Sequence, residues 1–147
     1  IHDIEAAVTA RENGGLLRVT TSSVFVPVLN QEADLLVYLD PECETISQRQ
    51  LDLLNRLLAV GPERLGEIKA QLYERWGEYD HFYTDEIQFE YDSPDAAFAA
   101  SQISSIVLND VDGPHADWPT LLFSVAWDPE HGANVVFDRD EFRWDID

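Results

Sequence analysis

The feature that most constrains the fold of this chain is a change in hydrophobic period. Between residues 47 and 77 the apolar residues recur at helical spacing, whereas the segments before and after this block carry short apolar runs typical of strands. No repeat, low-complexity tract or linker divides the chain, so residues 1–147 are expected to form a single acidic domain. The pattern predicts an α+β fold, in which an antiparallel sheet is covered on one face by a helical hairpin.

The segment before the helical block predicts three strands. They are expected at residues 16–20, 24–29 and 35–39. Pro27 has no N–H to donate to a ladder, which places the second strand at an edge or a bulge. Asp40-Pro41 is a turn signal that ends the third strand.

The helical block predicts two helices separated by a short break. Ser47 is the expected N-cap of the first helix, and Gly61-Pro62 ends it. The apolar stripe of this helix consists of Leu51, Leu54 and Leu58. A second helix begins near Glu63 and has Gly77 as a candidate C-cap. Its stripe consists of Leu65, Ile68, Leu72 and Trp76.

The rest of the chain predicts mostly β structure. Residues 87–91 alternate like a strand, residues 94–100 form at least one helical turn, and residues 121–127 form a strong strand. Residues 103–108 are either a strand or a short helix. A terminal hairpin is expected from residues 135–137 and 142–144, joined across residues 138–141.

The chain carries an excess of negative charge that is concentrated in its second half. Its formal net charge is -20, from 29 acids and 9 bases, and residues 80–147 hold 16 of the acids and 2 of the bases. Such a field repels nucleic acid and anionic lipid and attracts cationic protein surfaces. No apolar run approaches the roughly 20 residues that cross a bilayer. We therefore expect a basic protein as partner, and neither nucleic acid nor a membrane.

The cysteine content bears on the compartment. Cys43 is the single cysteine, which leaves no internal disulfide and favours a reducing cytoplasm. Its neighbours Glu42 and Glu44 disfavour the thiolate, so a nucleophilic role is not expected.

The best-defined local motif is Trp127-Asp128-Pro129-Glu130-His131-Gly132. It resembles the Trp-Asp-x-Glu-His-Gly signature of small, uncharacterised bacterial domains, in which it closes a strand before a Gly-led hairpin near the C-terminus. Some of these domains are encoded beside toxins of competition systems, where small acidic proteins act as immunity factors. The resemblance implies no enzymatic activity. The residues that it carries over are Trp127, Asp128, Glu130, His131 and Gly132.

The same motif admits two physical interpretations. Asp128, Glu130 and His131 can form a hard-cation or zinc site, with His115 or Asp117 contributing from the preceding loop. Alternatively, they form a tight turn in which Asp128 accepts hydrogen bonds from backbone amides and Gly132 supplies a positive φ. The Asp-x-Glu-His spacing matches no zinc signature, and we assign no metal and no cofactor to it.

A second candidate site follows the second predicted helix, where acids alternate with aromatic residues. The candidate partner-binding residues are Tyr79, Asp80, Phe82, Tyr83, Asp85 and Glu86. Carboxylates pair with Arg and Lys, and rings stack on guanidinium groups, so this segment suits a cationic cleft. The alternative is that the segment leads into a strand whose aromatic residues are core. Acids of the terminal hairpin are expected to add to the field, namely Asp138, Asp140, Glu141 and Asp145.

No catalytic motif is present in the sequence. It has neither a Gly-rich phosphate loop nor a nucleophile elbow. We expect a non-enzymatic, cytoplasmic bacterial protein that binds and neutralises a basic protein, such as a cognate toxin, by occluding its cationic cleft. Two alternatives stay open: a metal-dependent enzyme or sensor centred on Asp128, Glu130 and His131, and a salt-adapted housekeeping domain.

Overall fold

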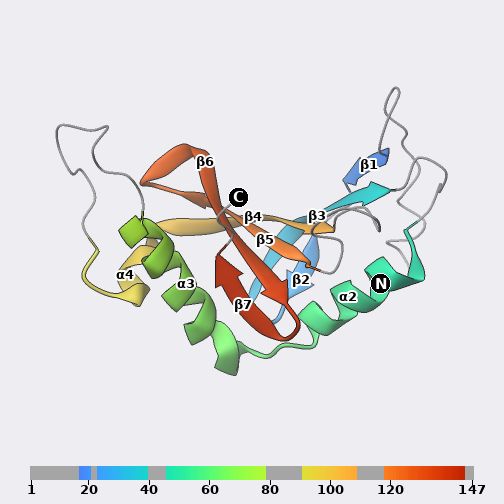
Figure 1. The fold of residues 1–147 in the computed structure, drawn as a ribbon, viewed down its shortest axis with the longest axis horizontal. Coiled ribbons are helices and arrows are strands. Elements are labelled where there is room, and N and C mark those ends of the chain that lie inside the picture. The colour runs from blue at the N-terminus through green and yellow to red at the C-terminus, as the bar shows by residue number, and fades with distance from the viewer. Residues whose placement is uncertain (1–16, 21–22, 40–45, 79–90, 109–117, 145–147) are drawn as a thin grey trace.

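The sheet dominates the architecture of the computed structural model, which describes residues 17–20, 23–39, 46–78, 91–108 and 118–144 (Figure 1). Six strands of the described chain follow the order β1-β3-β4-β5-β6-β7, and β2 pairs with the first part of β3. The strands are β1 (Leu17–Thr20), β2 (Val24–Val26), β3 (Gln31–Leu39), β4 (Ser101–Leu108), β5 (Thr120–Val125), β6 (Asp128–Asp138) and β7 (Glu141–Trp144). The helices are α2 (Gln48–Leu58), the short 3-10 helix η1 (Pro62–Arg64), α3 (Leu65–Glu78) and α4 (Pro94–Ala99). The α+β class is confirmed.

One pair of neighbouring strands departs from the antiparallel expectation. β3 and β4 run parallel, in a register that places Asp34 beside Ser105 and Val37 beside Leu108. Parallel neighbours require a long crossover connection, and the helical block between β3 and β4 supplies it. All the other paired strands are antiparallel in the described chain.

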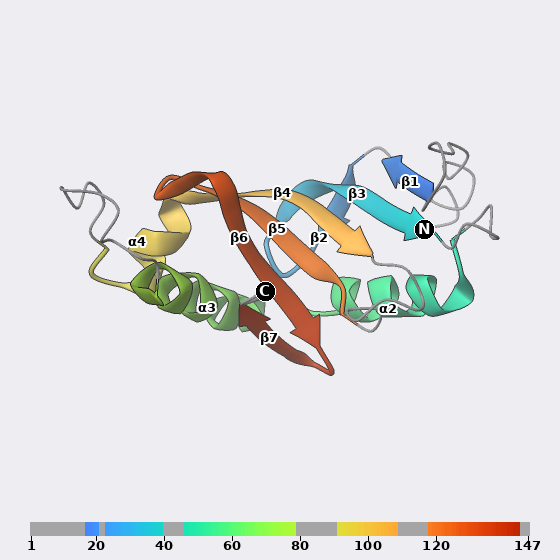
Figure 2. The same cartoon turned by 45° about the horizontal axis from the view of Figure 1, so that its top comes forward.

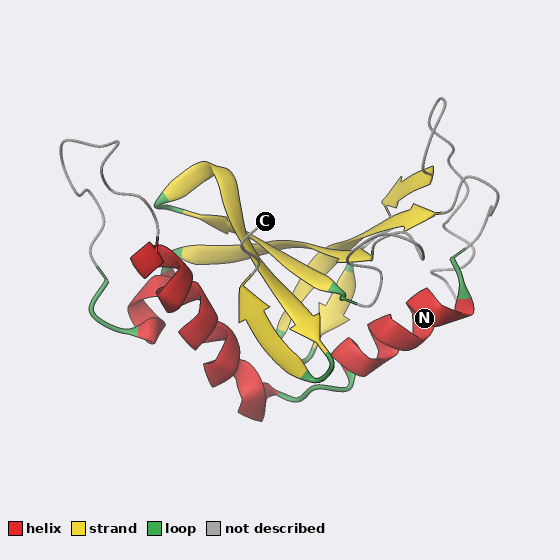
Figure 3. Cartoon of the chain, in the orientation of Figure 1, coloured by secondary structure: helices red, strands yellow, loops and turns green. Residues whose placement is uncertain are grey.

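α2 and α3 lie on the same face of the sheet but diverge from each other (Figures 2 and 3). Ser47 caps α2 as expected: its side chain accepts a hydrogen bond from the backbone N–H of Gln50, while the Gln50 side chain bonds back to Ser47. Pro62 begins η1 and turns the chain before α3, which then packs along β6 and β7. The two helices therefore form a splayed pair, and Gly77 lies inside α3 rather than capping it.

The core lies between the helices and one face of the sheet. Leu54 and Leu57 of α2 and Ile68 and Leu72 of α3 are fully buried. They pack in one cluster with inward-facing strand residues, among them Leu35, Ile106, Leu121, Phe123 and Val135. Burying a large aliphatic side chain of this kind contributes about 1.5 to 3 kcal/mol, so both helical stripes hold the helices on the sheet.

The boundaries of several elements differ from those expected. β2 ends at Val26, because residues 27–30 form a turn that has Asn30 at a φ of 52°. Residues 103–108 are a strand that begins at Ser101, and α4 precedes it with Ser93 as N-cap. The strand expected at residues 87–91 lies outside the described residues except for Tyr91. Among the described helices, none is long and apolar enough to cross a membrane.

Candidate functional site

The motif at Trp127–Gly132 lies where β5 turns back into β6. The sequence prediction of a turn over residues 128–132 is wrong in its position: the turn is Ala126-Trp127, and β6 already begins at Asp128. Val125 pairs with Asp128 and Phe123 pairs with Ala133, so residues 129–132 form a bulge with no counterparts on β5 apart from Ser124. Strand pairing continues on both sides of the bulge. The residues that the sequence predicts as a turn therefore lie within β6.

Asp128 holds this bulge from inside. Its side chain is 8% exposed, and its Oδ1 accepts a hydrogen bond of 3.3 Å from the backbone N–H of His131. The same oxygen lies 3.0 Å from Nδ1 of His131, whose side chain is 76% exposed. The Asp128 carboxylate therefore organises the backbone of the bulge and orients the imidazole. Its role as acceptor of a backbone amide is the one expected for the turn, although the residues lie in a bulge.

Gly132 completes the bulge for a steric reason. Its φ is +69°, a conformation that glycine adopts at little cost. A Cβ at this position would collide with the backbone carbonyl oxygen of Phe123 on the facing strand. Asp128 and Gly132 thus have structural roles, while Glu130 and His131 face solvent.

The metal interpretation requires at least three ligands close together. In the described part of the chain, no group of three or more His, Cys, Asp or Glu residues is arranged to hold an ion. His115 and Asp117 lie outside the described residues, as do the six candidate partner-binding residues Tyr79, Asp80, Phe82, Tyr83, Asp85 and Glu86.

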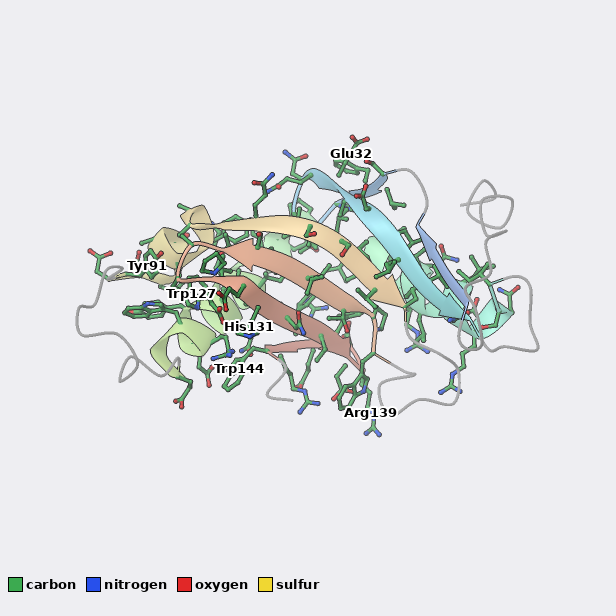
Figure 4. All side chains as sticks on the ribbon, turned by 90° about the horizontal axis from the view of Figure 1, so that it is seen from above. Glu32, Tyr91, Trp127, His131, Arg139 and Trp144 are labelled. Carbon is green, nitrogen blue, oxygen red and sulfur yellow. The ribbon has the colours of Figure 1, made fainter. Side chains whose placement is uncertain are left out.

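A row of aromatic rings runs from the motif to α3, and Figure 4 labels its members Trp127 and Tyr91. Trp127 meets Tyr91 edge-on at 5.7 Å between ring centroids, and Tyr91 meets Trp76 edge-on at 5.3 Å. Trp76 stacks on Tyr73 at 5.8 Å within α3. This row fixes Tyr91, the residue at which the described chain resumes after the candidate segment, against the helix that precedes the segment.

The hydroxyl of Tyr91 is a buried polar atom of this row. It has no hydrogen-bond partner within the described part of the chain. Burial raises the pKa of the Tyr91 hydroxyl above its usual value, because the charged form would lose its hydration.

Several basic side chains in the described part of the chain make contacts within the molecule. Four of them lie over aromatic rings: Arg64 over Phe137 and Phe142, Lys69 over Phe98, Arg75 over Trp144, and Arg143 over Trp118. Lys69 also pairs with Asp95 at 2.8 Å, and Arg143 pairs with Asp138 at 2.8 Å. These cations therefore tie elements together, and the charges of Lys69 and Arg143 are already paired with carboxylates.

Arg64 is the most fully engaged of these cations. Its Nε and Nη2 donate to the two carboxylate oxygens of Glu67 at 2.7 and 2.9 Å, and its Nη1 donates to Asp140 at 2.9 Å. The hydrogen bond from Arg64 is the main cause of a lowered pKa of the Glu67 carboxyl. Asp138 and Asp140 are both ion-paired, so these two acids of the terminal hairpin add less to the outward field than the sequence suggests.

Several carboxylates face solvent with no basic partner in the described part of the chain. They include Glu32, Asp34, Glu74, Asp92 and Glu130. Glu32 and Asp34 lie on the face of the sheet opposite the helices, near Phe25, the exposed large hydrophobic side chain among the described residues. The sequence prediction missed this group, although the alternation Glu32-Ala33-Asp34-Leu35 is the pattern of a half-buried strand.

Fold and surface together define a small acidic α+β domain, in whose described part several bases make internal contacts and several carboxylates without a basic partner face solvent. The chain belongs to the family described as "Domain of unknown function (DUF6985)", whose model matches residues 10–145. The resemblance to uncharacterised domains is confirmed to that extent. No curated protein and no solved structure matches the chain.

Proposed function

We propose that this domain is a non-enzymatic protein that binds and neutralises a basic protein, as an immunity protein neutralises a toxin. The observation that supports the proposal most strongly is the separation of charge within the molecule. Arg64, Lys69, Arg75 and Arg143 are bound to rings, three of them to carboxylates as well, while carboxylates such as Glu32 and Asp34 face solvent without partners in the described chain. We expect the net charge of -20 to give the domain an outward negative field.

Binding proceeds in two stages under this proposal. The outward negative field first steers the basic partner and raises the association rate constant from about 10⁵–10⁶ toward about 10⁸–10⁹ M⁻¹s⁻¹ at low salt. The segment with Tyr79, Asp80, Phe82, Tyr83, Asp85 and Glu86 then docks in the cationic cleft. The row of Trp76, Tyr91 and Trp127 supports this stage, because it anchors the chain immediately after the segment.

The test combines capture with kinetics. The immobilised domain is exposed at low salt to lysate of the source bacterium, and proteins released by increasing salt are identified and purified. We expect one basic protein in fixed stoichiometry. Its association with the domain should slow steeply as ionic strength rises, while its dissociation changes less.

Two controls separate the proposal from its alternatives. Replacement of Asp80, Asp85 and Glu86 by amides should slow association, whereas the same charge change at Asp52, Glu63 and Glu74, outside the segment, should have a smaller effect. An association rate insensitive to salt would contradict the proposal. Loss of folding at low ionic strength would instead support the salt-adapted alternative.

A further inference from the structure

The face of the sheet opposite α2 and α3 carries an exposed aromatic ring beside two carboxylates. Phe25 of β2 is 51% exposed, and it lies directly across from Glu32 of β3 in the antiparallel register. Asp34 lies two residues further along β3 and faces the same way, because Ala33 and Leu35 between and beyond them are buried in the core. In Figure 4, Glu32 lies near the β3 edge of the sheet, away from Trp127 and His131.

These three side chains are close enough to act together. Cross-strand partners have Cβ atoms about 4.5–5.5 Å apart, and diagonal neighbours such as Phe25 and Asp34 are about 7–8 Å apart. A guanidinium group can therefore lie on the ring of Phe25 and reach both carboxylates.

The molecule itself contains an occupied version of the same arrangement. Arg64 lies over Phe142 at 5.5 Å while it binds the carboxylates of Glu67 and Asp140. Phe25, Glu32 and Asp34 present the same three groups, one ring and two carboxylates, with no cation among them in the described chain.

We infer that Phe25, Glu32 and Asp34 form a receptor for an arginine side chain of a basic partner protein. This inference rests on the proposed function and adds a second contact region to it, on a different face from the candidate segment. Arginine fits better than lysine, since its planar guanidinium stacks on a ring and pairs with carboxylates at the same time. A second copy of this chain is disfavoured as occupant, because Glu32 and Asp34 of the two copies would repel each other.

The test uses two synthetic probes of equal charge, hexa-arginine and hexa-lysine, titrated into the full chain at low salt. Calorimetry gives the Kd, and backbone amide spectra report which residues are perturbed. We expect hexa-arginine to bind more tightly than hexa-lysine and to shift the amide signals of Phe25, Glu32 and Asp34.

Two variants and one matched control complete the test. Glu32→Gln with Asp34→Asn should weaken hexa-arginine binding by about tenfold or more, while the control Asp52→Asn with Glu63→Gln, an identical charge change on the helical side, should weaken it much less. Phe25→Leu keeps an apolar side chain but removes the ring, so it should weaken hexa-arginine binding more than hexa-lysine binding. All these positions are exposed, so thermal unfolding of each variant should match that of the parent chain.

The outcomes distinguish this inference from the proposal on which it rests. Salt-dependent binding that is weakened equally by the control pair, or that shows no preference for arginine, would overturn the receptor and leave the charge-driven binding proposal standing. If neither probe bound at low salt, the proposed function would be overturned together with the receptor.

Discussion

Arg64 donates two hydrogen bonds to Asp140: its Nη1 donates to Oδ1 at 2.9 Å, and its Nη2 donates to the backbone carbonyl oxygen at 2.6 Å. Asp140 and Arg139 form the two-residue turn between β6 and β7, with φ values of 82° and 51°. Both values lie in the left-handed region, as a type I′ hairpin turn requires, although neither residue is glycine. The contact thus stabilises a turn of unfavourable sequence and attaches it to the start of α3.

Replacing Arg64 by alanine should lower the free energy of unfolding by about 1 to 2 kcal/mol, because the packing on Phe137 and Phe142 and the bonds to two carboxylates are lost together. Equilibrium unfolding in urea measures the change. Arg56→Ala, at an exposed position of α2, is the control and should stay within about 0.5 kcal/mol of the parent chain. Equal losses of unfolding free energy in Arg64→Ala and Arg56→Ala would contradict the role of Arg64 in stabilising the turn.

The same cluster predicts a dependence of stability on acidic pH. Arg64 lowers the pKa of Glu67 below its ordinary value of 4.5 in the folded state, so the unfolded chain binds protons more readily near this pH. The contribution of Glu67 to stability is therefore complete above pH 4.5 and is lost as the pH falls through the lowered folded-state pKa. Urea midpoints of the parent chain and Glu67→Gln should differ at pH 7 and converge as the pH falls through the lowered folded-state pKa of Glu67. A difference that stays constant throughout the acid titration would refute the pairing.

Gly132→Ala should destabilise the protein by about 2 to 3 kcal/mol, because the new Cβ meets the Phe123 carbonyl and the φ of +69° becomes strained. Gly66→Ala provides the opposite control. Gly66 is exposed within α3, and a Cβ at this position would have no neighbouring atom within 4 Å. The substitution should therefore stabilise the helix by about 0.5 to 1 kcal/mol. Thermal or urea unfolding of the two variants should move in opposite directions.

The bulge predicts unequal effects at its two interacting side chains. Asp128→Ala removes a buried acceptor for the His131 amide and should cost about 1 to 2 kcal/mol of stability. His131→Ala removes a side chain that is mostly exposed and should cost about 0.5 kcal/mol or less. A metal centre would behave differently: stoichiometric metal retained through purification and lost in His131→Ala would contradict the structural interpretation.

Tyr91→Phe should leave stability unchanged or raise it by up to about 1 kcal/mol. The substitution keeps the ring contacts to Trp76 and Trp127 and removes a buried hydroxyl for which the described residues offer no hydrogen-bond partner. Trp127→Phe is the contrasting variant. It replaces a buried ring by a smaller one and leaves a cavity, so it should be clearly destabilising. A loss of more than 1 kcal/mol in Tyr91→Phe would show that the hydroxyl has a partner in solution.

Local chemistry in the sequence determined much of the fold. Ser47 starts α2, and Pro62 breaks the helical block at the expected place, because capping and the missing proline N–H act within a few residues. The hairpin of β6 and β7 was predicted from two apolar runs separated by a short polar turn, and its register places Phe137 opposite Phe142. The charge surplus is likewise a property of composition alone.

Only the tertiary structure decided which distant parts meet. The parallel pairing of β3 with β4 and the contact of Arg64 with Asp140 both join residues that lie far apart in the sequence. Helical and strand periods specify which face of an element is buried, but they do not specify which other element that face packs against. That choice depends on the free energy of burying both helical stripes on one sheet face. The same choice leaves Phe25, Glu32 and Asp34 together on the other face.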